Sequence, residues 1–272
     1  MSVASTLAIR VGCEFVYEAE WPTPAVFLVQ PDEREQPVRD ASWASDPQTA
    51  HHDYRDLYGN VCRRLTFAPG TTTLRYDALA DVSPEPADTD WSASEIPVEE
   101  LPDETLLYTL PSRLCPSDLV ADRAWELFGG VEPGWARVQA ICDWVHGNTK
   151  FSYGTSRPHT TAADVLEAGT GVCRDFAQLS VTFCRALNIP ARYCFGYLPD
   201  INVPPVDAAM DFCAWFEAYL GERWWTFDPR NNQRRIGHIT IARGRDAVDV
   251  AMVTTYGSAQ LKKMTVWADH LQ

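Results

Sequence analysis

The sequence predicts an α+β protein in which helices pack on an antiparallel sheet, preceded by a small all-β sandwich. Apolar residues alternate with others at period two over residues 9–17, which indicates a half-buried strand. Apolar residues recur at helical spacing from Phe176 to Leu187. Strand-like runs follow between residues 191 and 255, so the second part has its helices first and its sheet after.

The first part of the chain contains turn-forming dipeptides typical of β-hairpins. Turn dipeptides at Gly59-Asn60 and Pro69-Gly70 separate short runs of strand character. These runs cover residues 26–30, 61–67 and 71–79. We therefore expect residues 1–80 to form the β-sandwich domain.

Residues 81–104 are expected to form a Pro-rich, acidic linker. Four prolines lie among acidic and small residues, a composition that sustains neither a regular element nor a core. Residues 105–272 would then form the core domain. Helices are expected at residues 117–128, 134–146, 162–168 and 173–187, and strands at residues 191–197, 212–220, 223–228, 236–242, 247–255 and 263–267.

Composition and charge exclude several classes of function. The formal net charge of −14 over 272 residues would repel a phosphate backbone or an anionic membrane, so we expect no nucleic-acid partner. No run approaches the roughly 20 apolar residues of a membrane span, and the first residues lack the features of a signal peptide. We expect a cytoplasmic protein with no membrane association.

The eight cysteines show neither a Cys-x-x-Cys pair nor zinc-finger spacing. A disulfide framework and a structural zinc are not indicated, and no cofactor or metal is expected. Calcium dependence is also unsupported, because no loop has the spacing of calcium ligands.

Cys173 is the leading candidate for a nucleophile. It follows Gly171 and lies in the first turn of the predicted helix that carries Phe176. The positive end of the helix dipole and the unpaired N–H groups stabilise a thiolate there. A buried structural cysteine is the alternative for this position.

The spacing of two strong strands predicts where a second and a third site residue lie. If the loop between them holds two or four residues, Tyr219 faces Trp224. Asp228 then lies opposite Trp215 and is a diagonal neighbour of Cys213 on the same face. Pro229 would end the pairing just after Asp228.

Four segments together resemble the core of the bacterial transglutaminase-like superfamily, and the match covers about residues 106–249. They are Gly171-Val172-Cys173-Arg174-Asp175-Phe176-Ala177, Ile189-Pro190-Ala191-Arg192-Tyr193, Ala214-Trp215-Phe216-Glu217-Ala218-Tyr219 and Phe227-Asp228-Pro229. The strand-rich N-terminal region similarly resembles the β domain that often precedes this core.

The resemblance implies a papain-like core whose Cys-His-Asp triad performs thiol acyl transfer or amide hydrolysis on protein or peptide substrates. By motif, Cys173 is the nucleophile and Asp228 the orienting acid. The usual histidine position holds Cys213, so the sequence departs from the family at the general base. A thiol cannot replace imidazole as a proton shuttle near neutral pH.

Three hypotheses follow. In the first, catalysis continues with a base recruited from His159 or His238. In the second, the core is a binding module that uses the substrate groove without turnover. In the third, Cys173 and Cys213 form a redox pair or, with a histidine, a soft metal site.

Two aromatic residues are candidates for the walls of the groove. The N–H of Cys173 is half of an oxyanion hole, and the hydroxyl of Tyr153 could supply the other half. Trp215 is expected to line or back the groove in the predicted register.

Overall fold

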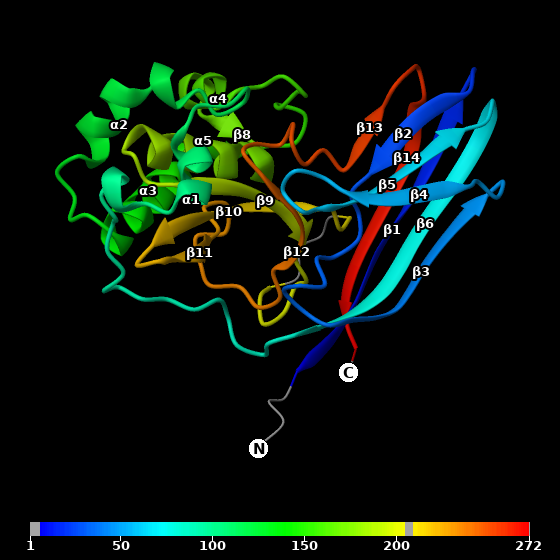
Figure 1. Cartoon of the computed structure of the whole chain (residues 1–272), viewed down its shortest axis with the longest axis horizontal. Coiled ribbons are helices and arrows are strands. Elements are labelled where there is room, and N and C mark those ends of the chain that lie inside the picture. Colours follow the sequence, from blue (N-terminus) through cyan, green and yellow to red (C-terminus); the bar gives the residue numbers. More distant parts are fainter. Residues whose placement is uncertain (1–5, 205–208, 272) are drawn as a thin grey trace.

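A computed structural model describes residues 6–204 and 209–271 and contains three layers, with a central sheet between helices and a β-sandwich (Figure 1). The helices are α2 (Ala121–Phe128), α3 (Trp135–Asn148), α4 (Ala162–Ala168) and α5 (Cys173–Ala186). The central sheet has the order β11 (Arg223–Phe227), β10 (Cys213–Leu220), β9 (Ala191–Tyr197) and β12 (Ile239–Gly244). The α+β class and the N-terminal β region predicted from the sequence are both confirmed.

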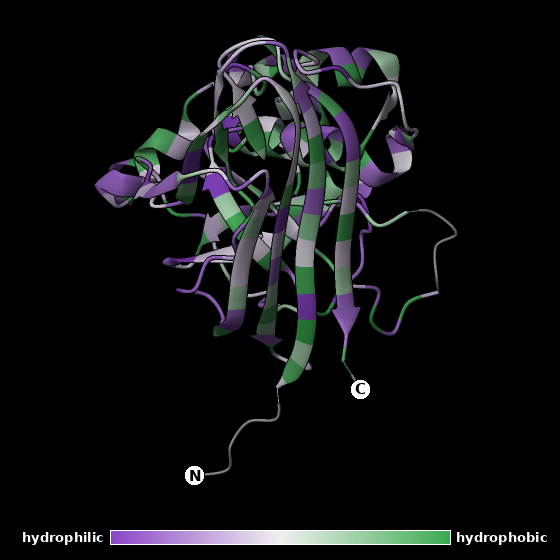
Figure 2. Cartoon of the chain, turned by 90° about the vertical axis from the view of Figure 1, so that its right-hand side faces the viewer, coloured by the Kyte–Doolittle hydropathy of each residue, from purple (hydrophilic) through white to green (hydrophobic). Residues whose placement is uncertain are grey.

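Two four-stranded sheets form the sandwich. One has the order β14 (Gln260–His270), β1 (Leu7–Ala19), β6 (Gly70–Val82) and β3 (Val38–Asp46), and the other has the order β13 (Val253–Thr255), β2 (Thr23–Phe27), β5 (Val61–Phe67) and β4 (His51–Arg55). Apolar and polar residues alternate along the long strands (Figure 2). Phe27 joins the two sheets, with its ring 5.7 Å from that of Phe15 and 6.1 Å from that of Phe67.

The domain boundaries differ from the expected ones at the C-terminal end. β14 pairs with β1, and β13 pairs with β2, so residues 253–270 complete the sandwich instead of the core. The strand expected over residues 247–255 is shortened to β13. β3 and β4 were not predicted, because their side chains are largely exposed and carry little apolar alternation.

The linker crosses from the sandwich to the helices without a helix or strand over residues 83–97. Short helical turns follow: η1 (Val98–Glu100), α1 (Asp103–Leu106), η2 (Leu107–Thr109) and η3 (Ser117–Leu119). Glu95 attaches the linker to the core, because its carboxylate accepts hydrogen bonds from Arg137 at 2.8 Å and from the N–H of Gly134 at 2.9 Å.

α5 packs its apolar side against one face of the central sheet. Phe176, Leu179 and Phe183 are all buried, which confirms the helical spacing predicted from the sequence. The sandwich covers the other face: Phe15 of β1 stacks on Phe212 at 6.4 Å, and the hydroxyl of Tyr197 donates to the carbonyl of Val29 at 2.8 Å. The central sheet is therefore buried on both sides.

A two-residue turn joins β10 to β11. Gly221 and Glu222 both have positive φ, at 53° and 67°, as a type I′ turn requires. Tyr219 pairs with Trp224, and Phe216 pairs with Phe227, as the sequence predicts. This register brings the chain at Asp228 next to the start of β10.

Candidate active site

Cys173 is the first residue of α5, at the edge of the central sheet. A short parallel pair, β7 (Lys150–Phe151) and β8 (Thr170–Gly171), delivers the chain to this position. The first N–H groups of a helix have no intrahelical acceptor, so a helix N-terminus favours a thiolate or an anion bound beside it. The Cys173 side chain is partly exposed, unlike most of the cysteines.

Asp175 fixes the start of α5. Its carboxylate is fully buried and accepts hydrogen bonds from the N–H of Val172 at 2.8 Å and the hydroxyl of Ser156 at 2.8 Å. A Cβ atom on Gly171 would lie only 2.7 Å from the Cβ atom of Asp175. Glycine is therefore required before the nucleophile so that the capping carboxylate can approach the backbone.

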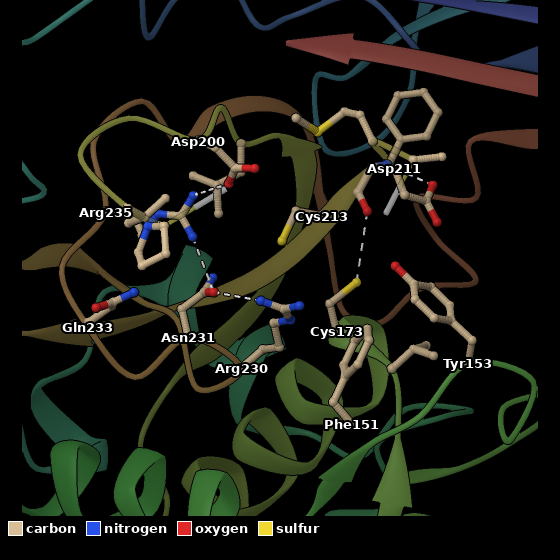
Figure 3. Close-up of a pocket in the computed structure, with 17 residues that line it drawn as sticks. Phe151, Tyr153, Cys173, Asp200, Asp211, Cys213, Arg230, Asn231, Gln233 and Arg235 are labelled. Atoms are coloured by element: carbon tan, nitrogen blue, oxygen red, sulfur yellow. Dashed lines mark hydrogen bonds and ion pairs between the residues drawn. The ribbon is translucent and has the colours of Figure 1, made fainter. Parts of the chain in front are cut away.

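Cys213 meets Cys173 at the start of β10 (Figure 3). The Cys173 thiol donates a hydrogen bond to the carbonyl oxygen of Phe212 at 3.9 Å, and Cys213 lines the same cavity. Interaction with Cys213 lowers the pKa of Cys173, while burial opposes the shift and the N–H of Ala214 and the charge of Arg230 support it. The same interaction, together with burial, raises the pKa of Cys213 well above its usual value. Cys173 is therefore the more acidic thiol of the pair.

Asp228 is buried and lines a different cavity from the cysteine pair. Burial opposes its ionisation, but hydrogen bonds from His238 and Asn231 and the charge of His238 lower its pKa below the usual value. The N–H of Asn231 donates to Asp228 at 3.0 Å, and the Asn231 amide donates to it at 2.6 Å. The Asp228 carboxylate therefore contacts both Asn231 and His238, and neither partner is Cys213.

Neither candidate for a replacement base shares the Cys173 cavity. His238 places Nε2 3.4 Å from the Asp228 carboxylate and lines a different cavity with Cys142. His159 is exposed near Asp164. Within residues 6–204 and 209–271, which include every histidine of the chain, none lines the cavity at Cys173.

Of the two aromatic residues predicted at the groove, Tyr153 lines the cavity and Trp215 does not. Tyr153 is 62% exposed and lines the cavity, with its side chain beside Cys173 (Figure 3). Trp215 is fully buried and packs against the ring of His238 at 4.8 Å. Trp215 was expected to line or back the groove; its side chain does not line the cavity, because the central sheet is covered on both sides.

The cavity at Cys173 has a volume of about 410 Å³ and is lined by residues that the sequence did not reveal. Arg230 and Asn231 come from the loop after β11, and Asp211 comes from the segment before β10. Partial burial of Asp211 raises its pKa, and the N–H of Phe212 opposes this shift. The only signal for Arg230 and Asn231 was their position two and three residues after Asp228.

An apolar extension of about 580 Å³ opens from the same cysteine pair. Its walls are mainly Tyr193, Phe195 and the stretch of residues 247–254. Cys173 thus lies between a polar limb with Arg230 and an apolar limb against the sandwich side of the molecule.

No group of three or more His, Cys, Asp or Glu side chains in the described ranges is arranged to hold a metal ion. The soft metal hypothesis needed a histidine beside Cys173 and Cys213, and none is there. In the part of the chain that the structure describes, no helix is long and apolar enough to cross a bilayer.

Comparison with known proteins agrees with this geometry. The family description "Transglutaminase-like superfamily" matches residues 122–229. A crystal structure of a "Putative Cysteine Protease" from Cytophaga hutchinsonii superposes with a TM-score of 0.88 at 31% identity and covers 98% of this chain and 92% of that one. An uncharacterized protein of Mycobacterium leprae is 29% identical over 75% of each chain, and one of Mycobacterium tuberculosis is 29% identical over 72% of this chain and 68% of its own. The chain belongs to the transglutaminase-like superfamily.

Proposed function

We propose that this protein performs thiol-dependent acyl transfer on peptide or protein acyl donors, with poor turnover of unactivated amides. The observation that carries the proposal is the position of Cys173 at the N-terminus of α5, in one cavity with Cys213, where its pKa is lowered without an imidazole. Superfamily membership and the similarity to a protein named as a cysteine protease support the reaction class. The eight free thiols fit a reducing compartment such as the cytoplasm.

The first half of the proposed reaction needs no base. The Cys173 thiolate attacks the carbonyl carbon, and the electron pair of the C=O bond moves to oxygen. The N–H of Cys173 faces that oxyanion, and the hydroxyl of Tyr153 is the candidate for a second donor. Collapse of this intermediate expels the leaving group and leaves a thioester on Cys173.

The leaving group decides which substrates react. An amine must gain a proton as it leaves, and the Cys213 thiol is a poor acid because its pKa is raised. An alkoxide or a thiolate leaves without that proton. We therefore expect esters and thioesters to acylate Cys173, and water or an amine to release the acyl group slowly.

A burst assay tests the proposal. Matched ester, thioester and anilide substrates with one acyl group would be given to the wild type and to Cys173→Ala, Cys213→His and Cys213→Ser. We expect a burst with the ester in the wild type, none in Cys173→Ala, and about 10² to 10⁴-fold faster anilide turnover in Cys213→His. Cys213→Ser is the matched control, since it keeps a small donor but supplies no imidazole.

Three results would contradict parts of this proposal. Absence of a thiol-dependent burst in every variant would favour a binding module that uses the groove without turnover. High wild-type anilide activity that His238→Ala or His159→Ala abolishes would reveal a working base. A burst that survives Cys173→Ala would exclude Cys173 as the nucleophile.

A redox switch is the second candidate, and the position of the free cysteines Cys173 and Cys213 in one cavity favours it. A peroxide would oxidise the Cys173 thiolate to a sulfenic acid, and the Cys213 thiol would displace water from it to form a disulfide. A cellular dithiol would then reduce the bond. Loss of the ester burst after peroxide, with recovery after dithiothreitol in the wild type but not in Cys213→Ala, is the expected signature.

A further inference from the structure

Arg230 presents its guanidinium group to the Cys173 cavity. Its Nη1 atom donates to Asn231 Oδ1 at 2.7 Å, and its guanidinium lies 4.5 Å from the centre of the Phe151 ring. Within the described ranges, Arg230 forms no ion pair, whereas the neighbouring Arg235 is paired with Asp200 at 2.9 Å. The charge of Arg230 is therefore available to a ligand.

The protein holds Arg230 in place before any ligand arrives. Asp228 anchors Asn231, and Asn231 Oδ1 accepts hydrogen bonds from both Arg230 and Arg235, the latter at 3.2 Å. His146 anchors the backbone of the same loop, with Nδ1 3.1 Å from the carbonyl oxygens of Pro229 and Arg230. Such preorganisation reduces the entropy that a ligand must lose to be bound.

The cavity is polarised across the nucleophile. Arg230 and Asp211 lie on opposite sides of the Cys173 sulfur in Figure 3, and both line the cavity. The Asp211 carboxylate would repel an anionic group on its side, so an anion in the cavity is directed toward Arg230. The protein has a formal net charge of −14 and therefore repels anions in general. The Arg230 guanidinium offsets this repulsion locally.

We propose that Arg230 binds a carboxylate of the substrate that lies next to the carbonyl attacked by Cys173. Guanidinium and carboxylate groups form charge-assisted, bidentate hydrogen bonds, which makes Arg230 a determinant of specificity for acidic acyl donors. The carboxylate comes either from an acidic side chain or from a free C-terminus. The use of this contact in turnover rests on the proposed function, but the binding of a carboxylate beside Cys173 does not.

Alkylation tests the binding without any turnover. Rates of modification of Cys173 by iodoacetate and by iodoacetamide would be measured in the wild type, Arg230→Gln, Arg230→Lys and Arg234→Gln. The ratio of the two rates cancels any change in the nucleophilicity of Cys173, because both reagents meet the same sulfur. Arg234 is the matched control, since it carries the same charge on the same loop but bonds to the linker carbonyl of Ala87 at 2.9 Å.

We expect the ratio of the iodoacetate rate to the iodoacetamide rate to fall about tenfold or more in Arg230→Gln. A loss of this size is typical when a hydrogen bond to a charged group is removed. Arg230→Lys should lie between Arg230→Gln and the wild type, and Arg234→Gln should keep the wild-type ratio. An unchanged ratio in Arg230→Gln, or an equal fall in Arg234→Gln, would overturn the proposal.

Substrates then identify the source of the carboxylate. Ester donors with Glu or Gln beside the scissile carbonyl, and with a free or amidated C-terminus, would be compared by kcat/KM in the wild type and in Arg230→Gln. A preference for one acidic member that Arg230→Gln removes would name the source. Ester turnover without such a preference, together with an unchanged alkylation ratio, would refute the carboxylate site but not the proposed function. An alkylation ratio that falls in Arg230→Gln, without any ester turnover, would support the carboxylate site and refute the proposed function.

Discussion

Cys173 and Cys213 have pKa values shifted in opposite directions, since their interaction lowers the pKa of Cys173 and raises that of Cys213. The arrangement differs from a Cys-His pair, since no imidazolium is formed. Other cysteines have the opposite tendency: burial raises the pKa of Cys13 to about 12 and that of Cys115 to about 11. Cys173 should therefore be the most reactive thiol of the chain.

The interaction with Cys213 should be visible in the pH dependence of alkylation. In Cys213→Ala, the Cys173 thiolate loses its main stabilising interaction, so its pKa rises and its alkylation rate at neutral pH should fall roughly tenfold for each unit of the shift. The rate of modification of Cys173, followed by mass spectrometry from about pH 6 to about pH 10, measures the midpoint.

Cys213→Ser controls for this measurement, since a hydroxyl still donates a hydrogen bond and its midpoint should stay near that of the wild type. Identical midpoints in Cys213→Ala and the wild type would mean that the helix terminus alone stabilises the thiolate. Faster modification of Cys13 or Cys115 than of Cys173 would refute the assignment of the nucleophile.

At the scale of elements, the site depends on how the β8 to α5 connection is packed. The sequence predicted the helix, with Cys173 in its first turn, because Phe176, Leu179 and Phe183 repeat at the helical period. It did not predict the buried Asp175 cap, which occupies the space that a side chain at position 171 would need.

Gly171→Ala should destabilise the protein by about 1 to 3 kcal/mol, because its Cβ atom would lie 2.7 Å from the Cβ atom of Asp175. The same change should slow alkylation of Cys173, since it displaces the start of α5. Chemical denaturation and alkylation rates measure the two effects.

Gly147→Ala is the matched control in α3, where a Cβ atom would meet nothing within 4 Å. That variant should be neutral or gain up to about 1 kcal/mol from the better helix propensity of alanine. Equal stability of the two variants would show that the space beside Asp175 is not restrictive.

At the scale of the whole molecule, a buried ion cluster connects the central sheet to the sandwich. Glu217 of β10 accepts from Arg243 Nη2 at 2.9 Å and contacts Arg192, while Arg243 lies 3.5 Å from Asp32. Burial opposes ionisation of Glu217, but the charges and hydrogen bonds of Arg243 and Arg192 lower its pKa below the usual value. The cluster joins residues that are distant in the chain.

Glu217→Gln should cost about 3 to 5 kcal/mol near neutral pH, because Arg192 and Arg243 lose the buried carboxylate that they share, although Arg243 keeps Asp32. A carboxyl group with a lowered folded-state pKa stabilises the native state above its unfolded pKa, and this contribution disappears as pH falls through the folded value. The difference between the wild type and the variant should therefore shrink below about pH 4.

Denaturant unfolding at several pH values measures this difference. Glu18→Gln is the control, since Glu18 pairs with Lys262 on the surface at 2.8 Å and should cost about 1 kcal/mol or less. A small and pH-independent effect of Glu217→Gln would show that the cluster contributes little to the connection of the layers.

The sequence by itself determined the elements whose signals are local. Period-two alternation located β1, helical periodicity located α5, and the parity of a two-residue turn set the register that brings Asp228 toward Cys213. These features depend on neighbours in the chain and on the strong preference of a buried face for apolar residues.

Tertiary structure alone decided the chemistry around the nucleophile and the true extent of the sandwich. β14 pairs with β1 across most of the chain length, and such a pairing leaves no local signal. Arg230, Asn231 and Asp211 reach the cavity from two loops, where no periodicity constrains the residues. The sequence did not show that Trp215 and His238 lie outside the Cys173 cavity. The packing of other layers on a sheet decides whether a side chain reaches a groove or a core, and the sequence of one strand does not contain that packing.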